Sequence, residues 1–352
     1  MFKDSKSIER FEAWWFGEII DRVLIQVYCY TGKPEQIPTP VSLEQKYLDS
    51  DFRIKEFDFH LKHTYFEGDA FAQFTTSIGP GTLSTYLGSR PVFAENTVWY
   101  EPCIQDIRNA EGLRFNPENV YWKSTLNLCR KAVEYFNEKL SVGFPDLIEN
   151  LDTIASLAGT DKLLFAFRDC PEAIIKLQDA IVDLYFEYYD RLYEILRDQN
   201  GCTSFSHFPA YGKGKVAKLQ CDFSAMISPS DFEKFCAPWL EKQAKKLDRV
   251  LYHWDGPCAL QHEKCLLNIK GIHAIQWVPG AGNPDCGNEI WYVLYERILK
   301  SGKSLMVSVK PQDAKKLVET FGPEKLNIIT STNTIEEAQQ LVKDSYKWKK
   351  RV

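Results

Sequence analysis

Two ionisable side chains stand close together in the short apolar stretch LYHWDGP, residues 251–257. Strand side chains alternate between faces, so a strand over residues 249–255 places Leu251, His253 and Asp255 on one face. Such a pair suits two kinds of chemistry: His253 can transfer protons while Asp255 orients its ring, or both can bind a divalent metal. The alternative is a polar strand end whose side chains bond to nearby loops.

Further candidates stand at the ends of neighbouring predicted strands. Asp222 and Ser224 follow KLQC and share one strand face with Gln220, although both also suit the N-terminal cap of the next helix. Trp277 ends AIQW directly before the loop PGAGNP, where an aromatic ring would form a pocket wall, and Gln276 stands beside it. We expect Asp222 to take part in catalysis and the other three candidates, Ser224, Gln276 and Trp277, to bind substrate.

The elements that must position these side chains alternate regularly from about residue 120 onward. Apolar β-rich runs precede helical patterns, as in RVLYHWDG before CALQHEKCLLNI and SLMVSVK before QDAKKLVETFG. This alternation predicts a parallel α/β sheet. Earlier runs near residues 25 and 70 bring the count to roughly eight strands, with CTSFSHF and KLQCDF competing for one place. We therefore predict a closed eightfold βα (TIM) barrel, whose active site lies at the carboxyl ends of the strands.

The helix boundaries follow capping rules. Ser228-Pro229 precedes a helix predicted across SPSDFEKFCAPWLEKQAKKL, and Thr334 with Glu337 three residues later forms a capping box for the last helix. An open doubly wound sheet is the alternative fold, but the chain has no GxGxxG or Walker-type phosphate loop.

The chain has no repeat, linker or low-complexity segment, which favours a single barrel domain over residues 1–352. Residues 1–65 would supply an N-terminal helical extension and the first strand. The net charge of −5 and the pI of about 5.8 argue against nucleic acid as a partner. No apolar run has the length of a signal peptide core or a membrane span, so we expect a cytoplasmic protein. Ten cysteines without a CxxC pair predict reduced thiols.

Several segments carry a more specific signal: GDAFAQFTTSIGPG, LQCDFSAMISPSDFEKFCAPWL, VLYHWDG, AIQWVPG and NIITST. Together they resemble the uroporphyrinogen decarboxylase-like superfamily, which includes tetrapyrrole decarboxylases and cobalamin-dependent methyltransferases. DFSAMISPSDFEKF is most like the family's segment with Asp, then Ser-Pro, then Phe. The resemblance covers most of the chain from about residue 65. It implies the eightfold βα barrel already predicted, and it matches Asp69 to the acid that the decarboxylases direct into the barrel.

The resemblance to the methyltransferases also implies a metal site. Those enzymes bind zinc through a His-x-Cys at a strand end and a later Cys. Here His253-Trp254-Asp255 stands at the matching place, with Ser331 or Thr332 where the later Cys would fall. A histidine and a carboxylate would still hold a borderline divalent metal, zinc included, if water or another acid completes the site. His253 and Asp255 are therefore the expected metal ligands.

The decarboxylases carry an Arg-rich motif after their first strand, and this chain has none after VLIQVYCYTGKP. Burying several carboxylates without paired cations would cost several kcal/mol each, which argues against a porphyrinogen substrate.

We expect a barrel enzyme acting on a small molecule, with His253, Asp255, Asp69 and Asp222 as its catalytic residues. The leading activity is methyl transfer linked to a corrinoid on a partner protein. The first alternative is decarboxylation of uroporphyrinogen or a smaller carboxylate. The second is a non-catalytic ligand-binding barrel, since the changes at the family's metal positions are those of an inactive site. A homodimer is among the expected states.

Overall fold

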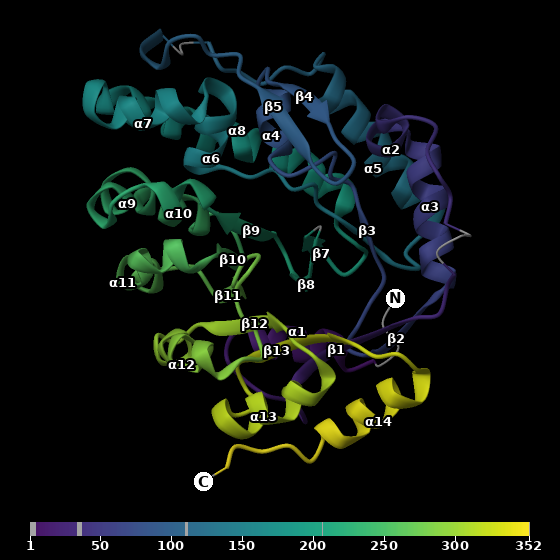
Figure 1. Cartoon of the computed structure of the whole chain (residues 1–352). Helices are drawn as coiled ribbons and strands as arrows, with labels where there is room; N and C mark the ends of the chain where they lie inside the picture. The colour runs from purple at the N-terminus through teal and green to yellow at the C-terminus, as the bar shows by residue number, and fades with distance from the viewer. Residues whose placement is uncertain (1–4, 34–36, 110–111, 206, 352) are drawn as a thin grey trace.

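The computed structural model describes residues 5–33, 37–109, 112–205 and 207–351 (Figure 1). Its main sheet has seven strands, and every neighbouring pair is parallel except β1 with β2. In spatial order the strands are β2 (Thr64–Gly68), β1 (Leu24–Tyr30), β13 (Leu326–Ser331), β12 (Ser304–Ser308), β11 (Ala274–Val278), β10 (Arg249–Asp255) and β9 (Val216–Gln220). The α/β class predicted from strand and helix alternation is confirmed.

Most helices lie around the outside of the strands in Figure 1. They are α1 (Ser7–Trp15), α2 (Leu43–Leu48), α3 (Ser50–Lys62), α4 (Thr82–Tyr86), α5 (Val120–Phe136), α6 (Asn150–Ala158), α7 (Thr160–Asp169), α8 (Pro171–Leu196), α9 (Pro229–Phe235), α10 (Ala237–Ala244), α11 (Glu263–Asn268), α12 (Tyr292–Lys300), α13 (Pro311–Phe321) and α14 (Ile335–Ser345). Short 3₁₀ turns add η2 (Ile107–Asn109), η3 (Asp222–Met226), η4 (Pro257–His262) and η5 (Glu289–Trp291). Of the helices described, none is both long and apolar enough to span a lipid bilayer.

The capping predictions are confirmed at two helix starts. The Ser228 hydroxyl accepts the Asp231 N–H, and Thr334 with Glu337 forms a reciprocal capping box. The single helix predicted after Ser228 is instead two helices, α9 and α10, because the backbone leaves helical geometry at Cys236. Pro238 follows two residues later and lacks the N–H that would continue the hydrogen-bond ladder.

The predicted closed eightfold barrel is only partly confirmed. Outside the main sheet, β3 (Gln73–Thr75) pairs in parallel with β6 (Ser141–Gly143), and β7 (Cys202–Phe205) pairs antiparallel with β8 (Phe208–Lys213). One parallel bridge, Phe144 to Phe205, connects these two pairs. Among the described residues, no strand ladder joins them to the seven-stranded sheet. β2 pairs antiparallel with β1, and β8 pairs antiparallel with β7. Each therefore occupies a strand edge that would pair with a parallel neighbour in a closed barrel.

A separate antiparallel hairpin lies away from the main sheet, formed by β4 (Arg90–Phe93) and β5 (Val98–Glu101). The architecture is therefore a mixed α/β fold with a mostly parallel sheet, compatible with a barrel-like arrangement.

The N-terminal helix α1 packs against the inner face of the sheet toward the amino ends of its strands. Trp14 and Trp15 are almost fully buried in one apolar cluster with Leu251 and other inner-face residues. The Ser304 hydroxyl donates to the Trp14 carbonyl at 2.6 Å, and the Trp15 indole N–H donates to the Tyr211 carbonyl at 3.0 Å. Because α1 covers the amino ends of the strands, we expect a functional site at their carboxyl ends.

Candidate functional site

Strand register aligns polar side chains near the carboxyl end of the sheet. Strand β10 spans Arg249–Asp255, as predicted, and within it His253 pairs in register with Gln220 of β9 and Gln276 of β11. Residues in register on neighbouring strands project to the same face. The three side chains therefore form one polar layer, with Asp255 one step further toward the strand end.

Gln276 fixes the orientation and the tautomer of His253. The His253 Nδ1 lies 2.5 Å from the Gln276 Oε1, while the Gln276 amide nitrogen donates to the Trp277 carbonyl at 3.3 Å. An amide oxygen only accepts hydrogen bonds, so Nδ1 carries the proton and Nε2 keeps its lone pair. Burial lowers the pKa of His253, and the positive charge of Lys218 lowers it further. The ring is therefore neutral near pH 7, as a base or a metal ligand requires.

The side chains of Asp222, His253 and Asp255 converge at this end of the sheet. One ligand atom from each lies within 4.8 Å of the ligand atoms of the other two. Both aspartates are exposed and the histidine is half-buried, so small molecules can approach. One imidazole and two carboxylates suit divalent ions such as zinc or manganese, and three protein ligands leave positions for water or substrate. Elsewhere in the described parts of the chain, no three His, Cys, Asp or Glu residues form a comparable group.

A second aspartate, Asp152 of α6, supports Asp222 from behind. Its carboxylate accepts the backbone N–H groups of Asp222 at 2.9 Å and Phe223 at 2.7 Å. The Gln220 amide donates to Asp222 at 3.0 Å and to Asp152 at 3.4 Å, linking the two acids. Burial, together with the charge of Asp222, raises the pKa of Asp152 to about 7. Although the Asp222 side chain is solvent-accessible, desolvation by the surrounding protein also raises its pKa, so this pair can hold a proton near neutral pH.

Beneath this layer lies a buried lysine with two further acids. Lys218 is ion-paired with Asp146 at 2.6 Å and donates to the Gln220 side chain. Glu149 is fully buried and accepts the Gln220 backbone N–H at 2.9 Å. Burial raises the pKa of Glu149 to about 8, although the nearby Lys218 charge acts in the opposite direction. The site therefore has more carboxyl groups than cations around it.

The loop that carries Glu149 has an unusual backbone. Ile148 and Asn150, on either side of it, adopt left-handed φ angles of 47° and 65°. That region is unfavourable for a β-branched residue and costs of order 1–3 kcal/mol. The Asn150 side chain stabilises the turn, since it accepts the Gln178 amide at 2.6 Å and donates to the Cys236 carbonyl at 3.4 Å. This strained turn holds Glu149 beneath the sheet end.

Asp69 does not join the cluster, in contrast to the sequence expectation. Its carboxylate is fully buried and accepts hydrogen bonds from Arg22 at 2.5 Å, Arg10 at 3.0 Å and Ser7 at 2.8 Å. It also accepts the Ile25 backbone N–H at 3.1 Å, which places it near the amino end of β1. Two guanidinium groups neutralise this acid, so its geometry is that of an ion pair joining α1 to β1 and not that of a catalytic group.

Trp277 also lies elsewhere than expected. Its side chain is completely buried on the helix-covered face, where its ring packs against Trp254 and Trp291. Gln276 and Trp277 are consecutive in a strand and therefore project to opposite faces. Only Gln276 faces the site, so the pocket-lining role expected for Trp277 does not fit the structure.

Ser224 is buried inside η3 with 1% of its surface exposed. Its carbonyl oxygen accepts a hydrogen bond from the His262 ring at 2.8 Å. Its role is therefore to hold the loop that carries Asp222, and its burial leaves little surface for substrate.

Sequence reasoning missed several residues that surround the cluster. Lys218 could have been found, because it alternates with apolar residues in the run VAKLQCD and shares the face of Gln220 and Asp222. Asp146, Glu149 and Asp152 come from a separate loop and helix, and no local pattern connects that segment with β9.

Comparisons with known proteins add a fold-level likeness. No protein-family model and no curated protein sequence matches the chain. Among solved structures, the chain is similar to a methyltransferase from Methanosarcina mazei, with a TM-score of 0.61 and 10% sequence identity over 97% of this chain and 98% of that one. At this identity the likeness shows a shared fold over nearly the full length of both chains.

Proposed function

We propose that the chain is a methyltransferase that uses a divalent metal held by Asp222, His253 and Asp255 to activate a small nucleophile. The observation that carries the proposal is the convergence of the three ligand atoms at the carboxyl end of the sheet. The full-length likeness of fold to a methyltransferase supports the reaction class. A corrinoid carried by a partner protein, as the sequence resemblance implies, would be the methyl carrier.

The metal would supply Lewis acidity that lowers the pKa of a bound hydroxyl, amine or thiol. The protein's own residues would orient and desolvate that group. Gln276 engages the Nδ1 of His253, which leaves Nε2 as the ring nitrogen with a free lone pair for a metal. Asp152, which is not a metal ligand and whose pKa is raised by burial, would accept the proton that the nucleophile releases.

The ligand set favours a hard nucleophile over a thiol. Two carboxylates and one imidazole are harder than the thiolate-rich set used to activate thiols, so an oxygen or nitrogen nucleophile fits better. The neighbouring Cys221 thiol is buried, and its pKa is raised well above the usual value by that burial. It is therefore poorly suited to replace a ligand.

Metal content and methyl transfer would test this proposal together. Wild type, His253→Ala and Asp255→Ala would be loaded with zinc, cobalt or manganese and analysed by mass spectrometry after dialysis. Each protein would then be assayed with methylcobalamin and panels of alcohols, amines and thiols. Asp51→Asn, an exposed acid paired with Lys131, is the matched control. We expect both metal and activity to be lost only in the site variants. Metal retained by both site variants would refute the ligand assignment.

A second activity, decarboxylation of a small carboxylate, is favoured by one observation. Asp152 has a pKa of about 7 and lies beside the site, so it could deliver a proton to a carbanion left after loss of CO₂. Lys218 is already paired with Asp146, so the site lacks the several free cations that a porphyrinogen needs. Release of CO₂ from a panel of small carboxylates, abolished in Asp152→Asn, would support this alternative. No turnover of uroporphyrinogen is expected.

A further inference from the structure

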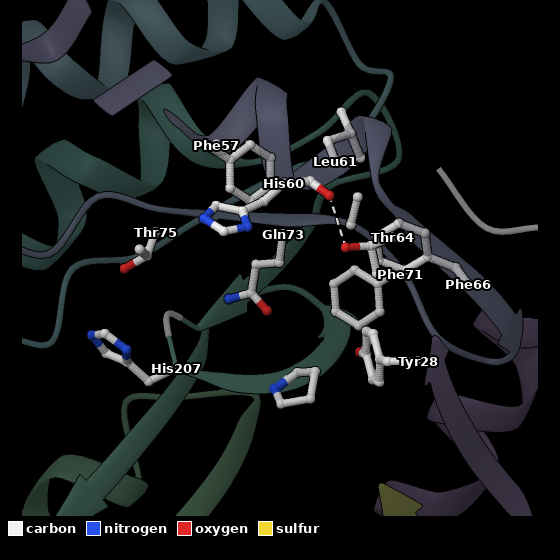
Figure 2. Close-up of a pocket in the computed structure, with 12 residues that line it drawn as sticks. Tyr28, Phe57, His60, Leu61, Thr64, Phe66, Phe71, Gln73, Thr75 and His207 are labelled. Atoms are coloured by element: carbon white, nitrogen blue, oxygen red, sulfur yellow. Dashed lines mark hydrogen bonds between the residues drawn. The ribbon is translucent and has the colours of Figure 1, made fainter. Parts of the chain in front are cut away.

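A cavity of about 360 Å³ lies between α3, the edge of the main sheet and the start of β8 (Figure 2). Its walls come from α3, β1, β2, the segment around β3, and the residues leading into β8. Four aromatic side chains form much of the lining: Tyr28, Phe57, Phe66 and Phe71. The volume falls in the range of about 300–1,000 Å³ that is typical of small-molecule pockets. The aromatic walls favour a flat, largely apolar ligand.

The twelve residues that line the cavity include no Asp, Glu, Lys or Arg. On β2, Phe66 and Thr64 face the cavity, whereas Glu67 alternates to the other face and accepts a hydrogen bond from Tyr65. The buried cation Arg53 donates to the backbone carbonyls of Tyr47 and of Thr75, which lines the cavity. A charged ligand would lose its hydration without gaining a partner of opposite charge, so the cavity selects against it.

Polar groups on the cavity wall are arranged to bind a hydrogen-bond donor. Figure 2 shows the Gln73 and Thr64 side chains at the cavity. The Gln73 amide N–H donates to the Phe205 carbonyl, and the Thr64 hydroxyl donates to the His60 carbonyl at 2.7 Å. Their oxygen lone pairs are therefore the groups that can accept from a ligand. His60 and His207 add imidazole nitrogens at the cavity wall.

We propose that this cavity binds an uncharged, single-ring aromatic molecule that carries a hydroxyl group, as a phenol does. The ring would lie among Phe57, Phe66 and Phe71, and its hydroxyl would donate to Gln73 or Thr64. That such a molecule is the methyl donor or acceptor rests on the proposed function, whereas its binding rests on the cavity alone.

The cavity is placed to present a ligand to the candidate site. His207 and Pro209 line it, and the ring of Phe208 between them lies 5.0 Å from the ring of His253. Phe208, which stands between two residues of the cavity wall, is therefore in contact with His253 of the candidate site.

Binding of three probes of matched shape would test the ligand class. The probes are p-cresol, 4-methylbenzoate and 4-methylbenzylammonium, titrated into the full chain by calorimetry and by saturation-transfer NMR. We expect p-cresol to bind with a Kd of about 0.1–1 mM, a typical affinity for a ligand of this size. Both charged probes should bind at least tenfold more weakly. Equal or tighter binding of either charged probe would overturn the proposal, as would the absence of saturable binding of p-cresol.

Two substitutions locate the binding. Leu61→Trp places an indole in the cavity and should abolish p-cresol binding, while Leu164→Trp, on the exposed surface of α7, should leave it unchanged. Thr64→Val removes one acceptor with little change of shape and should weaken binding severalfold, which keeps the test decisive if Leu61→Trp fails to fold. Binding that persists in a folded Leu61→Trp protein would refute the site.

The outcome is independent of the metal proposal. The double variant His253→Ala, Asp255→Ala should bind p-cresol as wild type does, even if it has lost metal and methyl transfer. If the wild-type protein shows no methyl transfer, the p-cresol titration still tests the cavity proposal.

Discussion

The two ends of the parallel sheet handle buried charge in opposite ways. At the amino end, the Asp69 carboxylate is surrounded by Arg10, Arg22 and a serine hydroxyl, and all of these groups are buried. At the carboxyl end, Asp222, Asp152 and Glu149 gather around Lys218, which is already paired with a fourth acid. The amino end is electrostatically balanced and serves stability. The carboxyl end has excess acid, which shifts pKa values and leaves ligands for a cation.

The largest expected effect comes from breaking the balanced end. Asp69→Asn removes the central acid of the buried network that contains Arg22 and Arg10, although Arg10 keeps its ion pair with Asp21, and should lower the free energy of unfolding by about 3–5 kcal/mol. Urea denaturation followed by circular dichroism would measure this. Asp255→Asn, at the exposed acidic end, is the control and should change stability by less than about 0.5 kcal/mol. If the two variants were equally stable, the contrast between the ends would be wrong.

A substitution at the acidic carboxyl end of the sheet should change metal affinity. Gln276→Leu leaves the ligands intact but removes the group that orients the His253 ring, so zinc affinity should fall by about 10–100-fold. Gln339→Leu, on α14 at the surface, serves as control. Competition with a chelating dye gives both affinities. An unchanged affinity in Gln276→Leu would mean that the ring does not depend on this contact.

Metal affinity should also rise with pH. Desolvation raises the pKa values of Asp222 and Asp152. At pH values below 7 a metal must therefore displace a proton from this pair, which weakens its binding. The pKa of His253 is lowered, so its ring stays neutral across the same range and contributes little to the slope. Zinc titrations between about pH 5.5 and 8 should show tighter binding with each step, and Asp152→Asn should flatten the profile. An affinity independent of pH would contradict the shared-proton account.

A smaller effect should appear in the pH dependence of stability. The folded-state pKa of Glu149 is about 8, above its unfolded value, so the folded state binds more protons between these values. Stability is therefore greatest at low pH within this window and falls as pH rises toward 8, by up to about 1.4 kcal/mol per pH unit for this group. Glu149→Gln should reduce that slope in urea denaturation at pH 5.5, 7 and 8.5. An unchanged slope in the variant would show that Glu149 is ionised in the fold.

Replacement of Trp277 should change stability alone. Its indole N–H has no hydrogen-bond partner, so Trp277→Phe loses only apolar contact and should cost about 1–2 kcal/mol in thermal unfolding. Because its side chain faces the helices, p-cresol and metal affinities should stay the same. A change in either affinity would return Trp277 to the pocket.

Local sequence patterns predicted the strand at 249–255, the shared face of His253 and Asp255, and the cap at Thr334, because each depends on neighbouring residues alone. Gln276 and Trp277 were both expected to bind substrate. Adjacent strand residues project to opposite faces, so they cannot both line one pocket. Asp69 was misplaced because its partners, Arg10 and Arg22, lie far away in sequence. The closed barrel is only partly confirmed for a similar reason: whether β2 and β8 run parallel or antiparallel to their neighbours is decided by tertiary packing.

The position of α1 has a consequence for how the chain reaches its final shape during synthesis. The hydroxyl that holds Trp14 belongs to Ser304, and Arg10 also contacts Tyr346, 336 residues later. These partners leave the ribosome long after α1 does. Helix α1 can therefore complete its packing only after Ser304 and Tyr346 have been synthesised. Contacts of such sequence separation slow folding and leave apolar surface exposed meanwhile. The apolar surface of Trp14 and Trp15 therefore stays incompletely covered until these later residues have been synthesised.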